Sequence, residues 1–548
     1  MSLSHNRRTR LIAALSLLLW VHGANSQGTP STVGTHRIAG HVLSAADGHP
    51  LPRASVSIAV SQGGTLVSSL TTGDDGAFSF EGVASGKYSL FGMRRGFIPS
   101  AYRGHELYST AIVTGAGIDT ENLDLQLEPE ASIIGRVLDE SGDPIPSAQV
   151  SLYAEKQDTG KKLINTYSST QTNALGDYVF AQLPAGNYFV SVRAEPWYAV
   201  PSSPGDPQAL FPDGIDATLD VAYPLTFYGD TIKQEAALPI PLKAGKRTRA
   251  DVHLSPVRAV RFKTGSRPGE PASFVFSLKT PVFDGFEDIS VSPQTNSAGE
   301  NEVVGLSPRK YEFETAAQAP DGTSYSGVVD LTQGSAEADP RRAIAEGSMT
   351  LSLVQEDGSK LPLQSSIMLR GSRPLSNNRQ EIAADGTVTF SNLPPDDYHF
   401  FVYGGNTVWQ TLRIEDGDKQ LAQDHRALEA GEAANLKLFV AGTAKAVEGT
   451  AVREGKPMAG AMIVLAPVDE LDNPDLFRRD QSDLDGTFAL MGVPAGRYIV
   501  VAIDDGWKLE WGKPEILTRF LLKGMPVAVP ATQREPFHLP SPVTVQER

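Results

Sequence analysis

Three aspartates just before Gly486 are the residues whose types and spacing come nearest to a metal-binding loop. Asp480, Asp483 and Asp485 would bring three carboxylates into one turn, and carboxylate oxygens are the ligands that Ca²⁺ prefers. The closing glutamate of an EF-hand loop is missing, however, and the same turn recurs along the chain. We therefore interpret the aspartates as turn residues and keep a calcium loop as the alternative. We predict that the chain holds no metal and no cofactor.

Two pairs of aromatic residues could contact carbohydrate, because tryptophan and tyrosine rings can stack on sugar rings. Trp197 and Tyr198 follow one predicted hairpin, and Trp507 and Trp511 follow another. The same rings could instead cap modules or fill contacts between them, since aromatic side chains bury large areas. On a helical turn or on a strand, Trp507 and Trp511 would share one face. We expect that pair to be covered, and carbohydrate contact stays the alternative for all four rings.

No catalytic constellation is recognisable in the sequence. It has no HExxH, no phosphate-binding loop and no CxxC, and the segment 322–326 lacks the last glycine of a nucleophile elbow. We interpret the scattered histidines, such as His253, His399 and His425, as isolated strand residues rather than ligands. We predict that the chain has no catalytic residues and is not an enzyme, with an unrecognised hydrolase as the alternative.

The element that recurs along the chain is a step from a glycine to a tyrosine twelve positions later. The five pairs are Gly76 with Tyr88, Gly176 with Tyr188, Gly299 with Tyr311, Gly386 with Tyr398, and Gly486 with Tyr498. A turn rich in Asp, Asn and Gly precedes one strand, and a second turn precedes the next, so each step predicts a tight β-hairpin. We interpret the tyrosine as a structural corner residue, with its ring in the core and its hydroxyl bonded to backbone.

Further short strands surround each step. An opening strand such as Ile38–Val42 precedes it, and an alternating strand such as Leu123–Leu127 closes it. Helical periodicity is confined to the N-terminus and to short pieces such as 471–477 and 514–522. Roughly seven short strands with regular turns are typical of a β-sandwich. The sequence therefore predicts an all-β fold, a tandem array of about five Ig-like sandwich modules.

The segments LPAGNY (183–188) and VPAGRY (493–498), with DGAFSF (75–80) and DGTFAL (485–490), carry a resemblance. They resemble the carboxypeptidase regulatory-like domain, a prealbumin-like sandwich with a starch-binding-like fold that is found in tandem in secreted bacterial proteins. The likeness is good in the first, second and fifth modules. It is degenerate in the third and fourth, where Arg309 and Asp396 replace the turn glycine. The resemblance implies a non-catalytic chain, because this domain is the appendage of the metallocarboxypeptidases and their α/β body is absent.

The N-terminus reads as a secretory signal peptide. A basic segment, 7–10, precedes the apolar run 11–21 and the small residues Ala24 and Ser26. A signal anchor is the alternative.

The predicted domains are a signal peptide at 1–26, a linker at 27–35, module 1 at 36–128, module 2 at 129–255 with an insertion, module 3 at 256–343, module 4 at 344–443 and module 5 at 444–548.

Composition limits the partners. The 548 residues contain no cysteine, which excludes disulfides and thiolate metal sites, and the net charge of -16 disfavours nucleic acid and anionic membranes. No segment of the mature chain is apolar enough to span a membrane.

We predict an exported protein of the periplasm, cell surface or medium that acts as a spacer or binding array. Its candidate partners are a polysaccharide or another envelope protein. The alternative is an accessory subunit of an outer-membrane uptake or export assembly.

Overall fold

The structure is a computed structural model that describes most of the chain from residue 34 to residue 548. The ranges left out within that span are 116, 159, 200–217, 265–275, 290–293, 296–300, 316–324, 339–343, 356–359, 363, 372–377, 405–406, 418, 422–424, 443, 469–470, 472–475, 494–495 and 531–534. The predicted signal peptide and Gly299 lie outside the described residues. The described chain is built almost entirely of strands, so the predicted all-β fold is confirmed.

Modules 1 and 2 are pairs of packed sheets. The strands of module 1 are β1 (His36–Ser44), β2 (Ser55–Val60), β3 (Leu66–Thr71), β4 (Ala77–Val83), β5 (Gly86–Met93), β6 (Phe97–Ile98), β7 (Ser100–Ala101), β8 (Ile112–Thr114) and β9 (Leu123–Pro129). Those of module 2 are β10 (Ala131–Leu138), β11 (Gln149–Asp158), β12 (Lys161–Gln171), β13 (Asp177–Leu183), β14 (Gly186–Arg193), β15 (Val221–Ala222), β16 (Thr226–Phe227), β17 (Ile240–Leu242), β18 (Arg247–Arg249) and β19 (Val252–His253), with a 3₁₀ turn at Gln234–Ala236.

Module 3 contains shorter strands. They are β20 (Val257–Arg258), β21 (Val260–Thr264), β22 (Phe276–Val282), β23 (Gly285–Ile289), β24 (Gln294–Thr295), β25 (Asn301–Leu306), β26 (Lys310–Thr315), β27 (Tyr325–Asp330), β28 (Ala336–Ala338) and β29 (Ile344–Ala345). Because β29 pairs with β27, the sheet of this module continues past the boundary predicted at residue 343.

Modules 4 and 5 have larger sheets. The strands of module 4 are β30 (Gly347–Gln355), β31 (Ser366–Arg370), β32 (Asn378–Glu381), β33 (Thr387–Leu393), β34 (Asp396–Gly404), β35 (Thr407–Asp416), β36 (Lys419–Leu421), β37 (His425–Leu428) and β38 (Ala433–Gly442). Those of module 5 are β39 (Ala444–Arg453), β40 (Lys456–Pro457), β41 (Met462–Pro467), β42 (Arg478–Gln481), β43 (Thr487–Val493), β44 (Gly496–Ile503), β45 (Met525–Val529), β46 (Phe537–His538) and β47 (Val543–Gln546). A 3₁₀ turn at Gly506–Lys508 and helix α1 (Pro514–Leu521) lie between β44 and β45.

One strand arrangement recurs in every module. The opening strand pairs antiparallel with the strand after the repeated glycine turn and parallel with a closing strand. In module 1, for example, β1 lies between β4 and β9. Each module range also encloses its own cluster of buried apolar side chains. The repeat seen in the sequence is therefore a repeat of topology as well.

The repeated tyrosines lie in these cores, with 6% or less of each side chain exposed. Four of them donate a hydrogen bond to the carbonyl oxygen four residues earlier: Tyr88 to Ala84 (3.1 Å), Tyr188 to Pro184 (2.9 Å), Tyr311 to Ser307 (2.7 Å) and Tyr398 to Pro394 (2.7 Å). Tyr498 is equally buried. This is the geometry of a corner residue, in which the ring fills the core and the hydroxyl fixes the preceding turn.

The four repeated glycines that the structure describes are required by backbone conformation and by space. Gly176 has a φ of +71°, and a Cβ atom there would lie 2.6 Å from the carbonyl oxygen of Val137. Gly76, Gly386 and Gly486 also have positive φ, and a Cβ at each would lie within 3 Å of a backbone oxygen. A side chain would therefore suffer left-handed strain and a clash with rigid backbone.

We expect Gly176→Ala to lower the free energy of unfolding of module 2 by roughly 3 kcal/mol, from backbone strain plus overpacking. Gly142 is a matched control in the same module, because its φ is +85° but a Cβ added there would meet no atom within 4 Å beyond its chain neighbours. Gly142→Ala should cost only about 1 kcal/mol. Denaturant unfolding of the two variants checks this, and equal losses would show that the contact with Val137 contributes nothing.

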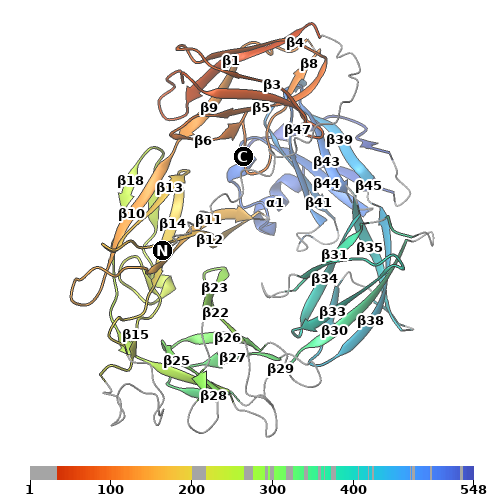
Figure 1. Ribbon diagram of the computed structural model, residues 1–548. Helices are drawn as coiled ribbons and strands as arrows, with labels where there is room; N and C mark the ends of the chain where they lie inside the picture. Colours follow the sequence, from red (N-terminus) through yellow and green to blue (C-terminus); the bar gives the residue numbers. More distant parts are fainter. Residues whose placement is uncertain are drawn as a thin grey trace, which may run out of the picture.

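The modules follow one another around a ring, and module 5 returns beside module 1 (Figure 1). The β22–β23 hairpin of module 3 packs on module 2, where Phe283 contacts the rings of Tyr153 and Phe227. In the described part of the chain, no helix is long and apolar enough to cross a membrane.

Candidate functional site

The first and last modules meet through a surface that we call the closing contact. It consists of the loop 102–111 between β7 and β8 of module 1, with Lys87 beside it, and of the turn 478–487 and Trp507 of module 5. The two sides are separated by more than 360 residues in the sequence. The contact is what brings the two ends of the array together, so its construction decides whether the ring is held closed.

A buried glutamine lies at the centre of the closing contact. Gln481 is 1% exposed. Its Nε2 donates to the carbonyl oxygen of Arg103 (2.7 Å) and to Oγ1 of Thr110 (2.8 Å), and its Oε1 lies 3.0 Å from Nδ1 of His105. All three partners belong to module 1. A buried amide without hydrogen-bond partners would cost free energy. The Gln481 side chain therefore favours this register of the two modules over any closed arrangement in which it would lose these partners.

Backbone and apolar contacts surround the glutamine. The N–H of Leu484 donates to the carbonyl oxygen of Ala111 (3.0 Å), and the N–H of Ala111 donates to Oδ1 of Asp483 (3.0 Å). The side chain of Leu484 packs against the hydrophobic core of module 1. A turn of module 5 therefore completes the packing of another module.

Two ion pairs cross the closing contact. Nζ of Lys87 lies 2.5 Å from Oδ2 of Asp483, and Nη2 of Arg479 lies 2.7 Å from Oε2 of Glu106. Burial raises the pKa of Asp483, and the hydrogen bond and charge of Lys87 act in the opposite direction. The partly buried position makes these pairs less exposed to screening by salt than an ordinary surface pair.

The aspartates considered for calcium have other partners here. Asp480 accepts hydrogen bonds from the N–H groups of Gln481 (2.8 Å) and Ala489 (2.6 Å), and burial raises its pKa to about 6. Asp485 accepts from the N–H of Thr487 (3.0 Å). Of the described residues, the one group of acidic and histidine side chains close enough to share an ion lies elsewhere, in module 4. Asp485 is a turn residue, whereas Asp480 lies on β42 and Asp483 binds Lys87 and the N–H of Ala111 in module 1.

Trp507 is covered by side chains of both modules. It is 7% exposed, and the ring of His105 stacks on it at 5.2 Å with an interplanar angle of 2°. The ring of Tyr108 lies against it at 5.3 Å, and the guanidinium of Arg479 lies 5.7 Å from its centroid. A ring packed in this way supports the closing contact and does not present a face to a sugar.

Trp511 joins a third module to the same region. It is 3% exposed and packs against Phe477 and the guanidinium of Arg479. The tip of the β11–β12 hairpin of module 2 lies on it, where the N–H of Gly512 donates to the carbonyl oxygen of Gly160 (2.9 Å) and Gln157 donates to the carbonyl oxygen of Leu509. A Cβ at Gly160 would lie 2.5 Å from the indole of Trp511, so only glycine fits there. Both tryptophans are covered, in agreement with our expectation for this pair.

The other aromatic pair is placed differently. Trp197 is 87% exposed and lies edge-on to Tyr198, with ring centroids 5.7 Å apart. The hydroxyl of Tyr198 donates to Glu140, which also accepts a hydrogen bond from Tyr223 (2.8 Å). Of the four candidate carbohydrate contacts, Trp197 is therefore the one with a largely exposed ring.

A cleft of about 660 Å³ lies beside the closing contact. Its walls come from both modules, and they include Arg103, His105, Asp124, Asp504 and Trp507. Because both modules line the cleft, it exists only while modules 1 and 5 stay together. A molecule that binds in it would therefore bind only to the closed ring.

Sequence reasoning missed the closing contact, and it misjudged two histidines. Leu484 gave no decisive signal, since an apolar residue in the equivalent turn of module 2, Leu175, is largely exposed. Gln481 gave no signal. The interpretation of His399 and His425 as isolated was wrong, because strand pairing places them directly opposite each other. That register depends on contacts far apart in the chain.

Comparison with known proteins gives one family match, to part of the chain, and several similar solved structures. No curated protein matches the chain. Among solved structures it is similar to the Bacillus anthracis TIE protein (12% identity, 76% of each chain covered, TM-score 0.18) and to the full-length major pilin of Streptococcus pneumoniae (9% identity, 94% of this chain and all of that one, TM-score 0.17). Residues 37–128 and 132–204 match the carboxypeptidase regulatory-like domain, which confirms the resemblance for this part of the chain. The matching segments span most of module 1 and the first part of module 2.

Proposed function

We propose that this chain is an exported, non-enzymatic scaffold whose β-sandwich modules are held as a closed ring. The observation that carries the proposal is the closing contact, in which the side chain of Gln481 makes its hydrogen bonds to module 1 and Leu484 packs against the core of that module. A flexible spacer would need neither, since linked modules without such contacts move independently. The hairpin of module 2 on Trp511 adds a second restraint.

A closed ring would fix the positions of its outer faces relative to one another. Partners that bind two modules at once then pay a smaller entropic cost than they would on a flexible string. The candidate partners remain another envelope protein or a polysaccharide. For a polysaccharide, the supporting observation is the exposed ring of Trp197. Export rests on the basic and apolar N-terminal segment.

Opening the ring tests the proposal. Leu484→Asp places a charge against the core of module 1, while in a separated module 5 the same residue would sit in a solvated turn. The chain has no cysteine, so cysteines introduced at the exposed positions Leu66 and Met491 can carry a pair of spin labels. We expect one narrow distance distribution for the parent chain and a longer, broader one for Leu484→Asp.

Leu175→Asp is the matched control. Leu175 lies one position further along the equivalent turn of module 2 and is 61% exposed, so its replacement should leave the distance distribution unchanged. Circular dichroism establishes that both variants keep their strands. A broad distribution in the parent chain, or a narrow one that Leu484→Asp does not alter, would contradict the closed scaffold.

A further inference from the structure

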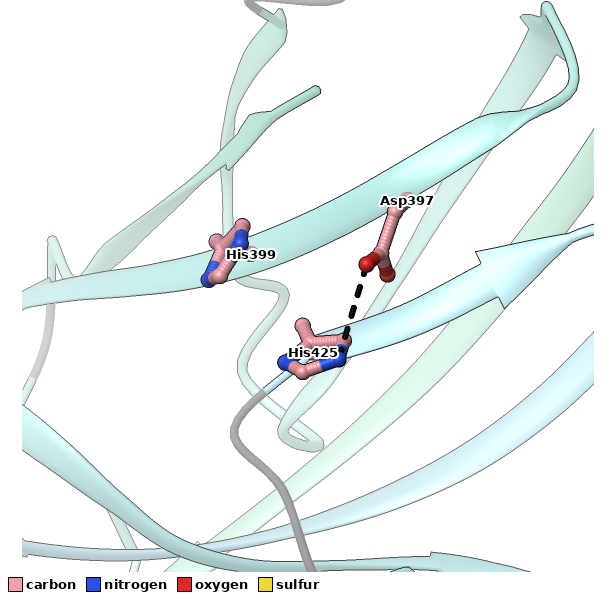
Figure 2. Close-up of side chains that lie close together, drawn as sticks. All are labelled: Asp397, His399 and His425. Atoms are coloured by element: carbon pink, nitrogen blue, oxygen red, sulfur yellow. Dashed lines mark ion pairs between the residues drawn. The ribbon is translucent and has the colours of Figure 1, made fainter. Parts of the chain in front are cut away.

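Three side chains with metal-binding groups meet on the outer face of module 4, although no sequence motif links them. Strand β34 pairs antiparallel with β37, and His399 lies directly opposite His425. Asp397 precedes His399 by two positions and therefore shares its face of the strand. The intervening Tyr398 is buried in the core, which places the three side chains on the other face. Figure 2 shows them converging from the two strands.

The distances suit a small ion. One ligand atom from each of the three residues lies within 4.8 Å of the others. Oδ2 of Asp397 is 3.5 Å from Nε2 of His425, and the two imidazole centroids are 5.0 Å apart. Ligand atoms of a tetrahedral zinc ion are about 3.4 Å apart, as bonds of about 2.1 Å require. Small rotations of these partly exposed side chains would reach that geometry.

The kind of ion follows from the donors. Two imidazoles and one carboxylate suit zinc, nickel or copper, whereas calcium and magnesium prefer oxygen ligands alone. Three protein ligands leave one position for water. Strand β31 pairs with β34 on the side away from β37, and its residue opposite His399 is Arg370. The guanidinium of Arg370 lies over the ring of Phe401, 4.9 Å from its centroid.

We propose that Asp397, His399 and His425 form a binding site for one divalent transition-metal ion of the zinc class. The site uses no residue of the closing contact, so it stands or falls independently of the scaffold. It would tie β37 to β34 and would add a metal-dependent restraint to one sheet of module 4. This replaces our expectation that the chain holds no metal.

Titration of the untagged full-length chain with zinc chloride, followed by calorimetry, tests the site. We expect one zinc ion per chain, and a loss of at least tenfold in affinity for His425→Ala and for His399→Gln, since removing one of three ligands weakens a small site severely. Millimolar magnesium should not compete. Circular dichroism of the variants separates loss of the site from loss of the fold.

His253 provides the matched control. It forms a similar pair with Asp230, with Nδ1 and Oδ2 3.1 Å apart, but the described residues around it supply no third ligand close enough to complete a site. His253→Ala should leave both the affinity and the stoichiometry unchanged. The proposal is overturned if the parent chain binds no zinc, if His425→Ala binds it as tightly as the parent, or if His253→Ala weakens it equally.

Discussion

Replacing Trp511 with alanine should lower the free energy of unfolding of module 5 by about 3 to 5 kcal/mol, the range for deleting a large buried aromatic side chain. The ring is 3% exposed and packs against Phe477, the guanidinium of Arg479 and the backbone of Gly160. The variant would lose this packing and leave a cavity between two modules. Denaturant unfolding of the full-length chain, followed by the fluorescence of the remaining tryptophans, among them Trp507 in the same core, measures the loss.

Trp197→Ala is the control for this change. The Trp197 ring is 87% exposed, so its removal should alter stability by less than about 0.5 kcal/mol. If Trp511→Ala were as mild as Trp197→Ala, the packing interpretation would fail. Loss of retention on an insoluble polysaccharide at an unchanged melting temperature would instead assign Trp511 to carbohydrate. Ready acrylamide quenching of the fluorescence of isolated module 5, whose two tryptophans are Trp507 and Trp511, would point the same way.

The modules could be predicted because their signals are local. The positive φ of Gly486 and the core position of Tyr498 are consequences of a hairpin of about a dozen residues, and the hairpin recurs with the same chemistry. The short helix was predictable for a similar reason, since Pro514 at its first turn marks where it begins. Patterns of this length are sufficient to identify the hairpin of each module and the start of the helix.

The ring and the histidine site could not be predicted in this way. Gln481 and Leu484 find their partners in a loop more than 360 residues earlier, and nothing in the spacing of either segment refers to the other. His399 and His425 face each other only because β34 and β37 pair in one register, and a shift by one residue would move one ring to the opposite face. Side chains assembled by long-range pairing are visible only in the folded chain.

Tyr188→Ala should cost module 2 roughly 3 kcal/mol or more, because it removes a buried aromatic ring and leaves a carbonyl oxygen without its donor. The side chain is 2% exposed, its hydroxyl donates to the carbonyl oxygen of Pro184 (2.9 Å), and its ring meets that of Tyr167 edge-on at 5.8 Å.

Tyr188→Phe divides the effect into its two parts. It keeps the ring in the core and removes only the hydroxyl, so it should cost about 1 kcal/mol, the net contribution of one hydrogen bond. The difference between the two variants is then the contribution of the ring, and denaturant unfolding of both chains measures it. Because Tyr88, Tyr311 and Tyr398 make the same bond to the residue four positions earlier, phenylalanine at each should cost a similar amount. Equal losses for alanine and phenylalanine at position 188 would mean that the corner is held by its hydroxyl rather than by its ring. The tyrosine would then fix the turn before β14 without contributing to the core of the module.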